Sequence, residues 1–253
     1  MNKGSPIIEV RNVSMRFNLA TEKTDTVKEY IVKLLKRQLM FNEFYALRDV
    51  SLTVNRGEAV ALIGANGSGK STLLKCIAGV LYPTTGSIQV RGSIAPLIEL
   101  GAGFDPDLTA RENIYLNGAV FGHDREFMDE HFKSIVDFAE LWDFIDVPVK
   151  NFSSGMVARL GFSIATEVSA DILVVDEILA VGDFRFQQKC KERMADMMKG
   201  GTTLLFVSHS EEQVRELCQK AVWLQRGELM MWGSCASVVE SYLAAQEIGR
   251  RSQ

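Results

Sequence analysis

Short apolar runs bounded by turn-forming residues recur along the chain and predict buried β-strands. Three of them are A-V-A-L-I at residues 59–63, D-I-L-V-V-D-E at 171–177 and T-T-L-L-F-V-S at 202–208. Strand composition also marks residues 7–13, 45–54, 87–91 and 94–97, and a hairpin is expected from 221–224 to 228–232.

Helical patterns lie between these strands. Thr109 and Glu112 have the spacing of a capping box, so a helix should begin near Ala110. From there to residue 145 the chain is expected to be mostly helical, with a break near Gly122. Further helices are expected at 72–78, 157–168, 184–199, 211–218 and 237–246. Strands that alternate with helices in this way predict an α/β fold.

Residues 22–41 form an insertion between two predicted strands. Apolar side chains recur there at helical spacing, at Val27, Tyr30, Ile31, Leu34, Leu35 and Leu39. The other face is largely basic and carries Lys28, Glu29, Lys33, Lys36 and Arg37. This pattern predicts a basic amphipathic helix, which either lies on an anionic membrane surface or a partner, or packs on its own domain.

Composition narrows the class of protein. A chain of 253 residues with 47% hydrophobic residues is sufficient for one large domain with its own core. A net charge of −4 supplies no general positive field, so no nucleic-acid partner is expected. No apolar run approaches the ~20 residues that cross a bilayer, so any channel must belong to another chain. The four cysteines form no C-x-x-C motif and are expected to be buried, reduced thiols.

Residues 64–71 read G-A-N-G-S-G-K-S, which is the phosphate-binding P-loop pattern. The glycines let the backbone approach phosphates, and successive N–H groups at a helix N-terminus attract an anion. Lys70 is expected to reach the β- and γ-phosphates, and the Ser71 hydroxyl to hold Mg²⁺. An ordinary glycine-rich turn would not constrain all these positions between a strand and a helix. The predicted nucleotide-binding residues are Gly64, Ala65, Asn66, Gly67, Ser68, Gly69, Lys70, Ser71 and Thr72.

Two carboxylates follow the apolar run I-L-V-V. Asp176 should lie at the carboxyl edge of a parallel sheet, where the P-loop also opens, and can hold Mg²⁺ there. Glu177 is expected to be the catalytic base that deprotonates the water attacking the γ-phosphate. Without the P-loop, the same two residues would be interpreted as exposed acids at the end of a strand.

Two more polar segments are candidates for the same chemistry. Ser153, Ser154 and Gly155 precede a predicted helix, where a hydroxyl, a backbone N–H and the helix dipole form a second anion site. Because this segment has no lysine or metal ligand, it makes sense as half of a site completed by another subunit; a plain serine N-cap is the alternative. His209 follows a buried strand and can hydrogen-bond a γ-phosphate oxygen, although a lone histidine there is often structural.

The order of these motifs resembles the nucleotide-binding subunit of an ABC transporter over about residues 7–235. The resemblance implies one ABC ATPase domain over residues 1–253. It would have a mainly parallel core sheet, a small antiparallel β part, a helical subdomain at about 99–165, and a C-terminal helix and tail at 236–253. It also implies hydrolysis of ATP to ADP and phosphate by a head-to-tail homodimer. Two ATP molecules would lie between the P-loop of one subunit and the S-S-G signature of the other.

The same resemblance also bears on the roles of individual residues. Phe17 falls at the adenine-stacking position, although on spacing alone it fits a packed core aromatic as well. Asp183 falls in the turn that communicates between the two ATP sites, and Lys70 and His209 join Glu177 among the catalytic residues. The usual middle-loop glutamine is missing. Glu99 or Leu100 lies there, and Glu99 is the better candidate. A carboxylate can coordinate Mg²⁺ but cannot donate a hydrogen bond unless protonated.

Departures from the common pattern indicate a subfamily. The signature reads F-S-S-G-M in place of L-S-G-G-Q. Together with the stretches around residues 97–114 and 176–190, it resembles the Wzt/KpsT type, the ATPase subunits of bacterial O-antigen, capsule and teichoic-acid exporters. The insertion at 22–41 is similar to the extra helix of the O-antigen branch, which is thought to sit near the entry of the lipid-linked substrate. A carbohydrate-binding domain after the ATPase is not expected, because the sequence ends soon after Gln246.

These observations predict an ATPase that uses ATP and Mg²⁺ to power export of a lipid-linked, O-antigen-like glycan. Its expected partners are a second copy of the chain and two copies of a membrane-spanning permease, which would hold it at the cytoplasmic face of the bacterial inner membrane. The alternatives are the ATPase of another exporter, for lipids, drugs or teichoic acid, or a soluble ABC ATPase of translation or DNA repair. The single cassette and the lack of a long coiled coil or basic arm disfavour the soluble class.

Overall fold

The computed structural model describes residues 4–20, 41–97, 100–101, 103–167, 170–176, 183–208 and 210–251. The predicted site residues Glu99, Glu177 and His209 lie outside these ranges, and so do residues 22–40 of the predicted amphipathic helix. Within the described ranges, no helix is long and apolar enough to cross a bilayer.

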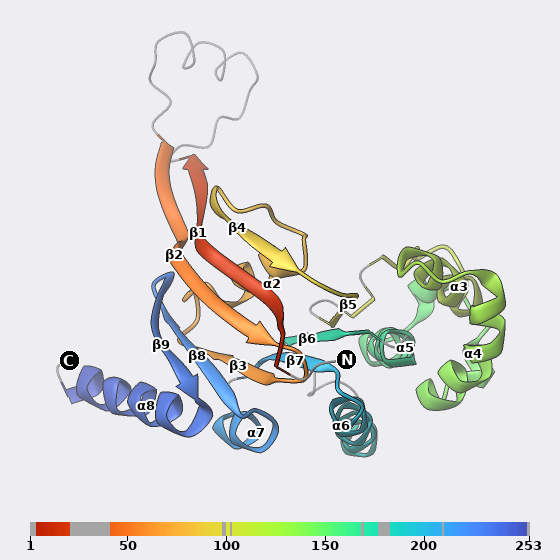
Figure 1. Cartoon of the computed structure of the whole chain (residues 1–253). Coiled ribbons are helices and arrows are strands. Elements are labelled where there is room, and N and C mark those ends of the chain that lie inside the picture. The colour runs from red at the N-terminus through yellow and green to blue at the C-terminus, as the bar shows by residue number, and fades with distance from the viewer. Residues whose placement is uncertain are drawn as a thin grey trace, which may run out of the picture.

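A six-stranded sheet forms the centre of the molecule, in the order β5-β6-β7-β3-β8-β9 (Figure 1). The first five strands in this order are parallel to one another, and the β8–β9 pair is the antiparallel hairpin predicted from the sequence. Its strands are β3 (Ala59–Ile63), β5 (Ile94–Leu97), β6 (Ile172–Asp176), β7 (Thr203–Val207), β8 (Lys220–Gln225) and β9 (Glu228–Ser234). β3 and β7 are buried along their whole length, which explains their continuous apolar sequences.

A three-stranded antiparallel sheet lies against one face of the core sheet. It consists of β1 (Pro6–Ala20), β2 (Phe41–Asn55) and β4 (Thr85–Val90). Both β1 and β2 are longer than predicted, because their pairing continues as far as Ala20 opposite Phe41. Phe41 therefore belongs to a strand, which corrects its placement at the end of the predicted inserted helix.

Helices cover the two faces of the core sheet differently. The alternation of side chains along β7 shows this, because Leu204 and Phe206 join one apolar cluster while Leu205 and Val207 join the other. The first cluster also receives helices α6, α7 and α8, and the second receives α2 and the small sheet. These helices are α2 (Lys70–Ile77), α6 (Phe184–Lys199), α7 (Glu211–Leu217) and α8 (Cys235–Arg251).

A third apolar cluster forms the core of the helical subdomain, which lies on the right of Figure 1. It is built from α3 (Ala110–Val120), α4 (Arg125–Ala139), the short 3₁₀ helices η1 (Trp142–Phe144) and η2 (Val149–Asn151), and α5 (Ser154–Glu167). The predicted capping box is present, since Thr109 accepts from the N–H of Glu112 and the Glu112 carboxylate accepts from that of Thr109. The predicted break near Gly122 separates α3 from α4, and Gly122 has a left-handed φ of 87°.

The four cysteines, Cys76, Cys190, Cys218 and Cys235, are buried and unpaired, as predicted. Burial raises the pKa of the Cys190 thiol to about 12. A thiol in this environment is protonated at neutral pH and chemically inert.

Candidate nucleotide-binding site

The P-loop connects β3 to α2 as the sequence predicts, and its geometry requires glycine at two positions. Gly64 has a φ of 149° and Gly69 a φ of 106°. A Cβ atom on Gly64 would lie 2.2 Å from the carbonyl oxygen of Leu224, and one on Gly69 would lie 2.5 Å from that of Ala46. The loop is therefore packed tightly against β2 and β8, which holds its backbone in one shape.

Lys70 is the first residue of α2 and is only 7% exposed. Its Nζ donates to the carbonyl oxygens of Gly64, at 2.8 Å, and Ala65, at 3.1 Å. Burial lowers the pKa of Lys70, and the negative charge of Asp176 acts in the opposite direction. The ammonium is thus held inside the loop by neutral carbonyls, which bind a cation less strongly than phosphate oxygens do.

Ser71 and Asp176 meet although they lie 105 residues apart, with the Ser71 hydroxyl donating to Asp176 Oδ2 at 3.2 Å. The strand order explains this contact. β3 and β6 are parallel to β7 on its two sides, so the P-loop and Asp176 leave the sheet at the same edge. A hydroxyl and a carboxylate are the oxygen ligands that Mg²⁺ favours in proteins, so these two residues fit the predicted ion.

A cavity of about 390 Å³ lies over the P-loop. Besides loop residues, it is lined by Asp176, Val207, Ala46 and Phe44, and Phe44 is 47% exposed. The sequence predicts Phe17 as the adenine-stacking residue, whereas the aromatic ring that lines this cavity belongs to Phe44. The two residues are directly paired across β1 and β2, so their side chains are on the same face of the sheet. Phe17 is half-buried against the core, whereas Phe44 reaches the cavity. Only the strand register could have revealed this pairing.

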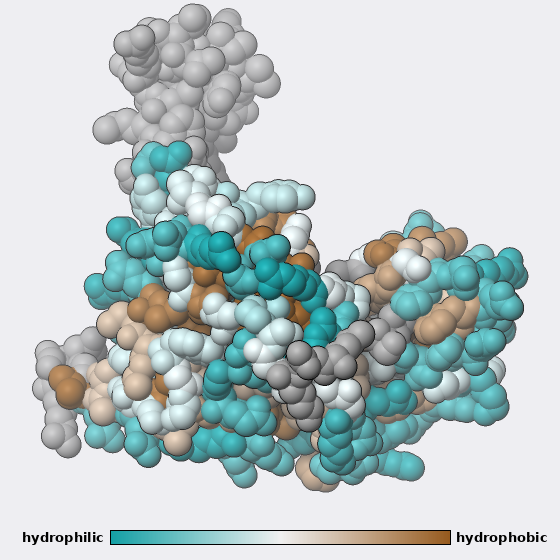
Figure 2. All heavy atoms as spheres, viewed as in Figure 1, coloured by the Kyte–Doolittle hydropathy of each residue, from teal (hydrophilic) through white to brown (hydrophobic). Residues whose placement is uncertain are grey.

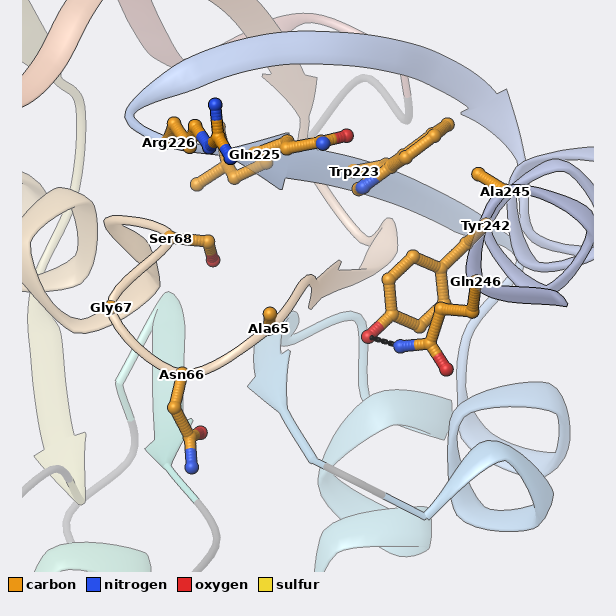
Figure 3. A pocket seen from close by; sticks show the side chains of 11 residues that line it. Ala65, Asn66, Gly67, Ser68, Trp223, Gln225, Arg226, Tyr242, Ala245 and Gln246 are labelled. Atoms are coloured by element: carbon orange, nitrogen blue, oxygen red, sulfur yellow. Dashed lines mark hydrogen bonds between the residues drawn. The ribbon is translucent and has the colours of Figure 1, made fainter. Parts of the chain in front are cut away.

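A second cavity, of about 370 Å³, lies on the other side of the same loop (Figure 3). Tyr242 and Gln246 of α8 face Trp223 and Gln225 of the β8–β9 hairpin across it. The Ser68 hydroxyl is buried beside this wall and has no hydrogen-bond partner among the described residues. The P-loop thus separates a polar cavity, which carries Lys70 and Asp176, from a mainly apolar one.

The Ser153–Gly155 segment lies in the helical subdomain, and none of its residues lines the cavity over the P-loop. α5 begins at Ser154, three residues earlier than predicted, because the Ser153 hydroxyl caps the helix by accepting from the N–H of Met156 at 3.2 Å. Ser154 and Gly155 therefore belong to the first helical turn. Both serines are exposed.

Asp183 is the N-cap of α6 and accepts from the N–H of Phe186 at 2.9 Å. It also pairs with Arg159 of α5 at 2.7 Å. The N–H of Phe186, and then the charge of Arg159, lower the pKa of the Asp183 carboxyl below its usual value. Asp183 remains ionised at neutral pH as a link between the core and the helical subdomain.

Comparison with known proteins agrees with this geometry. Residues 47–180 match the ABC transporter family. An O-antigen export system ATP-binding protein, RfbB of Klebsiella pneumoniae, is 43% identical over 242 residues, which cover 95% of this chain and 98% of that protein. A teichoic acids export ATP-binding protein, TagH of Bacillus cereus, is 41% identical over 94% of this chain and 42% of its own length.

Solved structures show the same fold. An ATP-binding subunit of an ABC transporter superposes with a TM-score of 0.74 at 22% identity and covers 93% of both chains. A dimeric ATP-binding cassette bound to ADP and Pi superposes with a TM-score of 0.72 at 21% identity, covering 90% of this chain and 98% of that one. With its P-loop and the Ser71–Asp176 pair in place, the chain belongs to the ABC transporter family as an ATP-binding, ATP-hydrolysing subunit.

Proposed function

We propose that this ATPase powers export of a lipid-linked, O-antigen-like polysaccharide across the bacterial inner membrane, together with a separate permease. The observation that carries the proposal is the 43% identity to an O-antigen export ATP-binding protein over nearly the full length of both chains. Similarity to teichoic-acid export proteins makes a teichoic-acid polymer the second candidate substrate.

The P-loop cavity supports a binding mode for ATP. The Lys70 ammonium lies against the carbonyls of Gly64 and Ala65, and would exchange them for oxygens of the β- and γ-phosphates. Ser71 and Asp176 would hold Mg²⁺, which neutralises charge on the phosphate oxygens when bound. The exposed ring of Phe44, beside that of Phe17, offers an apolar face for the adenine base.

For hydrolysis, we assign the general base to Glu177, which directly follows Asp176 in the sequence. Its carboxylate would take a proton from water as the water oxygen attacks the γ-phosphorus, and ADP would leave with the β-phosphate oxygen. His209 would donate a hydrogen bond to the γ-phosphate. Glu99 would stand in the place of the usual glutamine as a further metal ligand.

The signature segment implies that two subunits complete each site. Ser154 and Gly155 present helix N-terminal N–H groups at an exposed surface, outside the chain's own ATP cavity. In a head-to-tail homodimer they would bind the γ-phosphate of ATP held by the partner's P-loop, so that ATP closes the dimer and hydrolysis reopens it.

The permease would receive this motion at the helical subdomain. Figure 2 shows apolar residues exposed on this part of the surface, and α3 contributes Leu116 and Val120, which are 37% and 68% exposed. Apolar side chains in such positions suit a protein partner. Contact with the permease would place the subunit at the cytoplasmic face of the inner membrane. The basic helix proposed for residues 22–41 would lie near the lipid-linked substrate.

The test combines export and ATPase assays in cells that lack the subunit and are complemented with variants. Replacing Lys33, Lys36 and Arg37 with Gln should reduce surface polysaccharide several-fold, because each basic residue near an anionic surface contributes about 1 kcal/mol to binding. The ATPase activity of the purified subunit should stay near wild type, because these residues are separate from the hydrolysis site in the sequence.

Glu177→Gln serves as the matched control, because it should abolish both export and ATPase activity while ATP still binds. Normal export by the triple variant would contradict the membrane-side role of residues 22–41. Normal surface glycan in cells without the subunit, accompanied by loss of wall teichoic acid, would favour the second candidate substrate.

A further inference from the structure

The cavity on the far side of the P-loop has no role in the ATP chemistry described above. It has a volume of about 370 Å³ and lies between the P-loop, the β8–β9 hairpin and α8 (Figure 3). Small-molecule sites are usually cavities of about 300–1,000 Å³, mainly apolar, with a few polar groups that orient the ligand. This cavity therefore has the size and the character of a small-molecule site.

Two aromatic side chains give the cavity its shape. Trp223 comes from β8 and Tyr242 from α8, and their ring centres lie 5.8 Å apart at an interplanar angle of 67°. Tyr242 is held in place because its hydroxyl accepts a hydrogen bond from the side chain of Gln246, one turn further along α8. Fixed aromatic walls favour a planar ring as ligand, because ring–ring contacts add to the burial of apolar surface.

The charges around the cavity indicate the sign of that ligand. Arg226 is the one charged residue among the described residues that line it, and it forms no ion pair within the described part of the chain. Gln225 and Gln246 contribute neutral amides. A guanidinium without a carboxylate partner attracts an anionic group, and a planar carboxylate matches its geometry best.

The loop wall of the cavity contains an unsatisfied polar group. Ser68 is only 4% exposed, and its hydroxyl is the one buried side-chain polar atom of the described residues that lacks a hydrogen-bond partner. Leaving a buried hydroxyl unpaired is unfavourable. A ligand that carries a hydroxyl of its own would supply the missing partner.

The cavity shares this wall with the ATP cavity. Asn66, Gly67 and Ser68 line both cavities, and the N–H of Gly227 in the hairpin donates to the carbonyl oxygen of Ser68 at 3.0 Å. A ligand in the second cavity would hold the exposed crest of the loop, residues 65–67, in place before ATP arrives. ATP would then remove less conformational freedom on binding, so the two ligands should bind cooperatively.

We propose that this cavity is a regulatory site for a planar aromatic acid, and that occupation of the site raises the affinity of the subunit for ATP. The pair of Trp223 and Tyr242 binds the ring system, Arg226 binds the carboxylate, and the shared loop transmits the effect. The proposal goes beyond polysaccharide export, because it depends on the P-loop and not on which polymer is exported.

The experiment titrates the full chain with a hydroxynaphthoate, a flat two-ring acid that also carries a hydroxyl, and follows binding by calorimetry. We expect a dissociation constant of about 1 mM or lower, as for other ligands of this size. A non-hydrolysable ATP analogue should tighten binding of the acid at least about fivefold, and the acid should tighten binding of the analogue by the same factor. Naphthol, which lacks the carboxylate, should bind roughly two- to fivefold more weakly than the acid.

Two neighbouring positions of α8 supply a test variant and its matched control. Ala245 is exposed and lines the cavity, so Ala245→Phe should fill the space and weaken binding of the acid at least about tenfold. Ala244 is also exposed but does not line the cavity, so Ala244→Phe should bind the acid within about twofold of the wild type. Thermal unfolding of both variants checks that the fold is intact. Arg226→Gln should weaken binding of the acid roughly two- to fivefold and leave binding of naphthol unchanged.

The absence of binding at about 1 mM acid, or equal binding by the wild type and Ala245→Phe, would overturn the proposed site. Weaker binding of the acid in the presence of the ATP analogue would mean that the acid enters the ATP cavity instead. Affinities that do not change in either direction would overturn the regulatory role. If Ala245→Phe does not fold, Arg226→Gln decides: equal losses for the acid and for naphthol would overturn the assignment.

Discussion

The P-loop and the signature segment share a local arrangement, and in the proposed dimer they would be different half-sites of one ATP site. Both place serine hydroxyls and backbone N–H groups at the N-terminus of a helix. At the P-loop, the fold adds a buried lysine and brings Asp176 to Ser71. At the signature, the two serines are exposed, and the cation further along α5, Arg159, is engaged by Asp183 and Glu140.

This difference shows which groups a helix N-terminus needs, besides its N–H groups, to bind phosphate tightly. N–H groups and the helix dipole alone contribute roughly 0.3–1 kcal/mol for an exposed anion. A desolvated lysine and a metal-binding pair contribute several times as much, and only the P-loop has them. In the proposed dimer, the signature segment would therefore contribute strongly only after a partner has brought a nucleotide to it.

The largest expected effect comes from removing the cation that distinguishes the two half-sites. Lys70→Ala should weaken ATP binding by about 2–5 kcal/mol, which is roughly thirtyfold or more, because a buried phosphate charge loses its partner. Isothermal calorimetry of the purified subunit measures the affinity. Lys75→Ala, on the same helix but outside the cavity, is the control and should bind ATP normally. If the wild type, Lys70→Ala and Lys75→Ala bound ATP with equal affinity, Lys70 would not be part of the ATP site.

A smaller effect, visible in turnover but not in binding, is expected at the signature. Ser154→Arg should leave the ATP affinity of the isolated subunit within about twofold and reduce ATPase turnover on the order of a hundredfold, as loss of an oxyanion donor does. Ser154→Ala keeps the helix N–H groups and should retain more activity. When Ser154→Arg and Lys70→Ala subunits are mixed, some turnover should return. In the mixed dimer, one ATP site carries both substitutions and the other carries neither. Loss of ATP binding by Ser154→Arg alone would mean that the segment belongs to the subunit's own site.

The smallest expected effect is on ATP affinity, and it concerns the aromatic ring that lines the P-loop cavity. Phe44→Ala should weaken ATP binding by about 1–3 kcal/mol if the ring stacks on adenine. Affinity for inorganic triphosphate, which has no base, should stay unchanged and provides the control. Phe17→Ala should affect protein stability as well, because that ring is packed against the core. Equal losses for ATP and triphosphate in Phe44→Ala would indicate a distorted P-loop.

Features whose geometry is local could be predicted from the sequence, and features that depend on distant residues could not. The P-loop and the capping box at Thr109 were predicted at the right residues, because each is a short pattern whose backbone geometry is set by its own neighbours. The start of α5 was misplaced by three residues, since Ser153 can be interpreted as a ligand-binding serine or as a helix cap from local sequence. Phe41 was assigned to a helix, because apolar periodicity cannot show how far β1 and β2 remain paired.

By itself, the sequence determined the local chemistry: a glycine-rich phosphate loop between a strand and a helix, carboxylates after a buried strand, and a serine-glycine helix start. Only the tertiary structure decided which of these groups meet. Ser71 reaches Asp176 because β7 lies between β3 and β6, Phe44 stands beside Phe17 because of the strand register, and Arg159 pairs with Asp183 because α5 and α6 pack together. The physical reason is that backbone geometry within a motif depends on a few adjacent residues, whereas strand order and helix packing depend on burying apolar surface across the whole chain.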